Sequence, residues 1–126
     1  MAGNSETLHE PDLPADVIDR HRAIVSIMEE LEAVDWYDQR AAATADADLA
    51  EVLGHNRDEE KEHAAMTLEW LRRHDPALDR HLRTYLFVDA DILEVEEAAE
   101  HGGDTDDPTS GSLGIGSLRN DSEDSL

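Results

Sequence analysis

The sequence predicts an all-α fold built on one antiparallel two-helix hairpin. Residues 15–43 and 49–74 both place apolar side chains with the period of an amphipathic helix. Neither segment contains proline, and Gly54 is the one glycine within them, which weakens a helix only slightly. A short segment, residues 44–48, joins the two helices, and so short a connection favours antiparallel neighbours.

The ends of the two long helices carry recognisable signals. Residues 1–13 show no clear period, so we expect a mobile N-terminal segment there. Pro14 suits the start of the first helix, because a helix start has unpaired N–H groups in any case. Either Asp46 or Asp48 is expected to cap the second helix, and Asp75-Pro76 to end it near His74.

Two short helices are expected after the hairpin, over residues 77–87 and 92–100, so the predicted helical domain is 14–100. From His101 onward the composition turns to glycine, serine and aspartate, and residues 101–126 are predicted to be a disordered tail. Within it Leu113, Ile115 and Leu118 are apolar residues on a glycine-rich strip. These three side chains are either incidental features of a linker or the anchors of a peptide that docks in a partner's groove.

Charge and composition exclude several classes of function. The formal net charge is −22, from 10 basic and 32 acidic residues, which argues against nucleic acid and anionic membranes as partners. With no cysteine, disulfides and thiolate ligands are excluded, and any metal site must use oxygen and nitrogen. No apolar run approaches membrane-spanning length and no secretion signal is recognisable, so a cytoplasmic location is expected.

Glu30 lies in or at the edge of the apolar stripe of the first helix. At about 100° per residue, Ala23, Ile27 and Val34 fall close to it. A carboxylate in such a place is costly unless it is protonated, paired or bound to a metal. No lysine or arginine lies on that face to pair with Glu30.

The second helix carries the step Glu60-x-x-His63 on a polar strip that also holds Asn56 and Thr67. Residues three apart face the same partner, so Glu60 and His63 can hold one ion. Because this step is common by chance in glutamate-rich helices, a solvated helix face is the alternative. Di-iron carboxylate sites take a lone glutamate from each of two helices and Glu-x-x-His from each of two others. This chain has one of each, so a complete site needs a second copy and a four-helix bundle.

Charge supports iron as the metal of the paired site. Two chains would supply four carboxylates, from Glu30 and Glu60, and two neutral imidazoles from His63. Two ferrous ions balance that charge, and oxygen-rich ligation with one imidazole per metal favours iron or manganese over zinc. A hairpin of this size also buries too little apolar surface to be stable alone, which again predicts an oligomer.

Other polar residues gather on the outer faces. Glu29, Glu32 and Trp36 share one face of the first helix; His55, Glu59 and Glu62 share one of the second. A solvated acidic face is the ordinary interpretation. The alternatives are a ring of acids that attracts cations and a weak surface cation site. Tyr37 lies near Glu30 and is a hydrogen-bond donor to the site, a redox-active neighbour or an ordinary core tyrosine.

Three stretches of the hairpin region and one of the tail resemble the encapsulated ferritins. The stretches are residues 28–37, 56–71 and 82–87, together with the tail segment 111–118, which resembles the encapsulin-loading peptide of that family. The resemblance covers residues 8–119. The aspartate-rich linkers and the acidic last residues depart from the family pattern.

The resemblance implies a ferroxidase, an enzyme that oxidises Fe(II) with dioxygen at a di-iron centre between subunits. It implies a ferritin-like four-helix bundle from two hairpins, an annular decamer of five dimers, and residence inside an encapsulin shell bound through residues 111–119. The implied roles are iron ligands for Glu30, Glu60 and His63; a metal uptake site for Glu29 and Glu32; a flanking position for Trp36; and a place beside the centre for Tyr37.

Two alternatives stay open. One keeps the di-iron centre but changes the reaction to peroxide reduction or to oxygen activation on an organic substrate, although no substrate pocket is recognisable in the sequence. The other is a non-enzymatic helical cargo or scaffold protein whose acids only keep it in solution.

Overall fold

The computed structural model describes residues 7–105, in which helices are joined by short non-helical segments. The elements are α2 (Ala15–Ala43), α3 (Ala47–Arg73), α4 (Pro76–Tyr85) and α5 (Ile92–Thr105). No β-strand occurs between residues 7 and 105, which confirms the all-α prediction. The chain divides after Asp79 into two compact units, the first holding α2 and α3 and the second holding α5.

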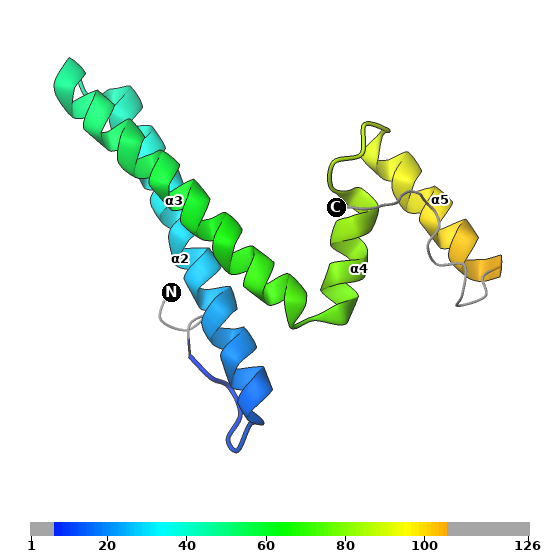
Figure 1. The fold of residues 1–126 in the computed structure, drawn as a ribbon. Helices are drawn as coiled ribbons and strands as arrows, with labels where there is room; N and C mark the ends of the chain where they lie inside the picture. The colour runs from blue at the N-terminus through cyan, green and yellow to red at the C-terminus, as the bar shows by residue number, and fades with distance from the viewer. Residues whose placement is uncertain (1–6, 106–126) are drawn as a thin grey trace. The chain divides into compact units, whose positions relative to one another are not determined.

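Helices α2 and α3 form the expected antiparallel hairpin and lie side by side along their length (Figure 1). Ala23 of α2 and Ala64 and Leu71 of α3 are the buried apolar residues of the described chain. Arg57 ties the helices together, because its Nη1 lies 2.9 Å from Oδ1 of Asp38. Two of the three buried side chains are alanines, so the buried core of the hairpin is thin.

Aspartates cap three of the four helices, which explains where these helices begin. The carboxylate of Asp46 accepts from the Leu49 N–H at 2.9 Å, as one of the two expected caps. Asp75 accepts from the Leu78 N–H at 3.0 Å, and Asp91 from the Glu94 N–H at 3.2 Å. Pro76 is accordingly the first residue of α4. Pro14, by contrast, lies just before α2 as its N-cap.

The hairpin leaves much of its apolar surface uncovered. The exposed large apolar residues of the first unit's helices are Ile24, Met28, Leu31 and Trp36 on α2 and Leu49, Val52, Met66 and Trp70 on α3. Where exposed apolar side chains gather into a patch, they mark an interaction site in natural proteins. The prediction that one hairpin is an incomplete core agrees with this exposure.

The end of the second unit differs from the sequence prediction. Helix α5 runs to Thr105 and passes through Gly102 and Gly103, whereas the glycines were expected to end it at Glu100. The Cβ of any other residue at Gly102 would meet open space, so no close packing requires a glycine there. In the same unit Phe87 follows α4 with a φ of 62° and is fully exposed. None of the helices between residues 7 and 105 has the length and apolar character that crossing a bilayer requires.

Residues 106–126 lie outside the described part of the chain. They include Leu113, Ile115 and Leu118 and nearly all of the predicted tail. Residues 1–6 of the predicted N-terminal segment lie outside it too.

An ion-pair cluster holds the end of α3 to the start of α4. Arg72 makes two hydrogen bonds to Glu69, at 2.8 and 2.7 Å, and also pairs with Asp79. Arg73 adds a third bond to Glu69 at 2.6 Å. The hydrogen bonds from Arg72 and then Arg73 lower the pKa of Glu69 to about 2.

This cluster predicts a pH dependence of stability. Because the pKa of Glu69 is lower in the folded chain, its ionised form stabilises the fold above the ordinary pKa of 4.5, and that contribution disappears as the pH falls toward 2. Glu69→Gln should therefore lower the urea midpoint at pH 6 and match the wild type near pH 2. Glu51→Gln, at an exposed position of the same helix, is the control. A Glu69→Gln deficit that persists unchanged at pH 2 would contradict the prediction.

Candidate metal centre

Glu30 is half-buried on α2, and one of its oxygens lacks a partner. Oε1 is buried and makes no hydrogen bond. Oε2 lies 3.5 Å from Oγ1 of Thr67, at the limit of a hydrogen bond. The same hydroxyl also lies 3.0 Å from the His63 carbonyl, its better acceptor. A buried carboxylate oxygen left in this way is unfavourable unless a cation or a proton reaches it.

Glu60 and His63 lie side by side on α3. His63 Nδ1 is 3.5 Å from Glu60 Oε1, and its Nε2 is 4.0 Å from Glu59 Oε1. The Glu60 side chain is 28% exposed and that of His63 is 45% exposed. The pair can therefore still be reached from solvent, as a site completed by another molecule requires.

The contact of Glu30 with Thr67 shows the axial register of α2 against α3. Since Thr67 is one turn beyond His63 on α3, Glu30 faces the same part of α3 that carries the Glu-x-x-His step. Even so, no three side chains of His, Asp or Glu in residues 7–105 form a group able to hold a metal ion. A single hairpin provides the predicted residues but not a closed set of ligands.

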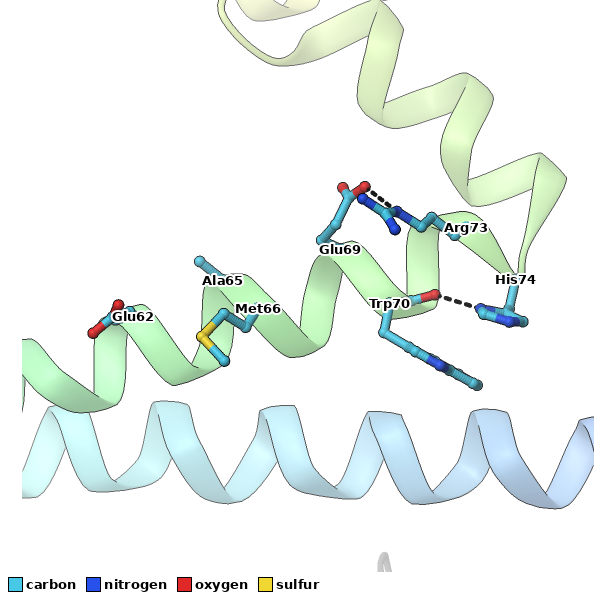
Figure 2. Close-up of a pocket in the computed structure, with 7 residues that line it drawn as sticks. All are labelled: Glu62, Ala65, Met66, Glu69, Trp70, Arg73 and His74. Atoms are coloured by element: carbon cyan, nitrogen blue, oxygen red, sulfur yellow. Dashed lines mark hydrogen bonds and ion pairs between the residues drawn. The ribbon is translucent and has the colours of Figure 1, made fainter.

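Apolar side chains lie close to His63 on α3. Figure 2 shows a surface groove lined by Met66 and Trp70, which follow His63 by one and two turns. Met66 is 63% exposed, and Val52 lies on the same face of α3. The Trp70 ring stacks on His74 at 3.9 Å, and His74 Nδ1 lies 2.8 Å from the Trp70 carbonyl. The face of α3 that carries His63 therefore also carries exposed apolar side chains.

The residues predicted for outer sites are only partly brought together. Glu29, Glu32 and Trp36 are all exposed on α2. His55 Nε2 lies 3.8 Å from Glu59 Oε2, but Glu62 lies along the groove of Figure 2 and no three-residue group forms in the described chain.

Two contacts near the site were missed by the sequence analysis. Thr67 was placed on the polar strip without a partner, and its contact with Glu30 depends on how the helices meet. Arg40 had no assigned role, yet its guanidinium lies 5.3 Å from the centre of the Trp36 ring and 5.9 Å from that of Tyr37. The spacing gives a signal for this contact, because Arg40 follows the two rings by four and three residues on one helix.

Comparison with known proteins identifies the family. The EncFtn-like family profile matches residues 6–89, which is about two thirds of the chain. The chain belongs to the EncFtn-like family. The EncFtn-like match covers α2, α3 and α4 and ends before α5.

Individual relatives agree with the EncFtn-like assignment. The chain is 56% identical to the encapsulated ferritin-like protein of Rhodospirillum rubrum, over 94% of this chain and 92% of that protein. It is 49% identical to a ferritin-like protein of Thermotoga maritima, over 90% and 99% of the two chains. A crystal structure of a protein from Nitrosomonas europaea matches with a TM-score of 0.66 and 56% identity, over 68% of this chain and 96% of that one.

Proposed function

We propose that two copies of this chain pair through their hairpins and oxidise ferrous iron with dioxygen at a centre built from both. Each copy contributes Glu30, Glu60 and His63 as ligands of iron. The proposal deepens the EncFtn-like assignment, whose relatives are named as ferritin-like.

The unpartnered Oε1 of Glu30 is the observation that carries the proposal. Within the described chain it lacks a hydrogen bond, and the weak contact of Oε2 with Thr67 does not compensate for the loss of water. The donor set of carboxylates with one imidazole fits iron. A cation shared with a second chain would satisfy this oxygen and complete the set that one hairpin lacks.

The uncovered apolar face supports pairing of two chains. Val52, Met66 and Trp70 are exposed on the face of α3 that carries His63, and burying them would stabilise an assembly by about 25 cal/mol per Å² of apolar surface. A second hairpin placed there would bring its own ligands toward the Glu60–His63 pair. It would also form the four-helix bundle that this family of sites requires.

Each residue of the proposed centre has a distinct role. Glu30 and Glu60 bind the cation and offset its charge, while the neutral His63 supplies nitrogen. Ferrous iron is the substrate and gives its electrons to dioxygen. The Thr67 hydroxyl lies beside Glu30 but donates to the His63 carbonyl, which leaves the Glu30 carboxylate available to a cation. The exposed acids Glu29 and Glu32 beside Trp36 attract cations toward the centre.

The proposed setting is an encapsulin shell. The Rhodospirillum rubrum relative is named as encapsulated, and the tail segment 111–119 resembles a loading peptide. Leu113, Ile115 and Leu118 would anchor the chain to the inner surface of the shell, where ferric product collects. An annular decamer of five dimers is the assembly proposed for the cargo.

A comparison of oxidants tests the reaction. Purified full-length protein mixed with Fe(II) in aerobic buffer should form Fe(III) at least tenfold faster than buffer alone, with consumption of dioxygen in proportion to iron. Hydrogen peroxide under anaerobic conditions should give no faster turnover than dioxygen. Preference for peroxide would support the peroxidase alternative, and a rate equal to buffer would support the scaffold alternative.

A further inference from the structure

Arg40 differs from the other two arginines of α2 in the kind of side chain that it contacts. Arg20 pairs with Asp16 and Arg22 with Asp19, each through a short ion pair. Arg40 makes no ion pair with any residue in 7–105. Its guanidinium lies instead over two aromatic rings at once, 5.3 Å from that of Trp36 and 5.9 Å from that of Tyr37.

A fixed positive charge on the face of an aromatic ring makes the ring harder to oxidise. The cation is attracted by the electrons of the neutral ring. Removing one electron leaves a positively charged ring, which the guanidinium repels. One arginine therefore acts on both rings, and its effect is largest on Trp36, the nearer one.

Both rings lie within two turns of Glu30 along α2. Tyr37 lies two turns from Glu30 on the same face of α2, and Trp36 is 51% exposed beside Glu29 and Glu32. Three ferrous ions and three protons reduce one dioxygen to one water and one hydroxyl radical, and the iron becomes Fe(III). That radical takes an electron and the phenolic proton from tyrosine, which becomes a phenoxyl radical while the oxidant leaves as water. At tryptophan the electron reduces the radical to hydroxide, and the indole proton then converts it to water.

We propose that Arg40 protects Trp36 and Tyr37 from one-electron oxidation, so that electrons are withdrawn from the iron rather than from the protein. This biological purpose rests on the proposed iron oxidation. The effect of Arg40 on the rings does not, and it is measurable in metal-free protein.

The chain provides its own reference rings for the test. Metal-free full-length protein is exposed to azide radical from pulse radiolysis, a neutral oxidant that takes one electron from each ring and becomes azide. Products are counted by peptide mass spectrometry as the ratio of Trp36 to Trp70 oxidation and of Tyr37 to Tyr85 oxidation. Because both members of each ratio share one chain, differences in radical dose cancel.

Arg40→Met removes the charge but keeps a long side chain to cover the rings, and Arg22→Met is the matched control. We expect Arg40→Met to raise the Trp36 to Trp70 ratio about threefold and the Tyr37 to Tyr85 ratio by less. Arg22→Met should leave both ratios as in the wild type. Unchanged ratios in Arg40→Met overturn the proposal, and so does an equal rise in Arg22→Met. Loss of iron oxidation in Glu30→Ala bears on the proposed function alone.

Discussion

Replacing Glu30 with alanine is expected to lower the protein-dependent rate of iron oxidation by about a hundredfold or more, so that the observed rate falls to that of buffer without protein. Loss of groups that merely support a metal ligand typically costs 10- to 100-fold in affinity or activity, and Glu30 is proposed as a ligand itself. The substitution also removes the buried Oε1 that lacks a hydrogen bond, so the fold should tolerate it. His63→Ala should have a comparable effect.

Stopped-flow absorbance of Fe(III), with equal protein concentrations, measures the rate. Glu51→Ala is the matched control, because Glu51 is an exposed glutamate in the body of α3 with no ion pair in the described chain. Thermal unfolding of each metal-free variant separates a loss of ligand from a loss of fold. Wild-type rates in both Glu30→Ala and His63→Ala would leave the scaffold alternative as the explanation.

The start and the end of α3 could be predicted because short sequence signals determine where a helix begins and ends. Asp46 as a cap and Asp75-Pro76 as a stop are signals contained in a few residues, and the structure follows them. Two helix ends were the exceptions: α4 was expected to reach residue 87 but ends at Tyr85, and α5 extends beyond its expected end at Glu100. Glycine has a low intrinsic helix propensity, but Gly102 and Gly103 continue a helix that already has an aspartate cap at Asp91.

The sequence predicted which helix face carries each candidate ligand, but it did not predict which side chains contact one another. The period of α2 places Glu30 at the edge of the apolar stripe, and the structure gives it a half-buried side chain. Its partner Thr67 could not be derived, because the axial register of α2 against α3 depends on the geometry of the turn between them. The long Arg40 side chain can adopt several rotamers. Sequence spacing alone therefore does not show that it lies over the rings of Trp36 and Tyr37 instead of pairing with a carboxylate.

Metal removal is expected to dissociate the paired chains at neutral pH. In the pair, the carboxylates of Glu30 and Glu60 from both copies would crowd together without a cation, and such crowding disfavours their joint ionisation. The formal net charge of −22 on each chain adds a longer-range repulsion that salt screens. The apolar face around Met66 and Trp70 favours association but carries this electrostatic cost.

Sedimentation velocity at fixed ionic strength measures the effect. Chelated wild-type protein should associate at least tenfold more weakly than protein with anaerobic Fe(II), and calcium at the same concentration should restore little of the difference. Glu30→Gln should associate more tightly than the wild type in chelator, because it removes two of the four crowded charges, and should gain less from Fe(II). Glu51→Gln should behave as the wild type. Chelated wild-type protein that associates as tightly as the iron-loaded form would show that the four carboxylates do not face one another across the pair.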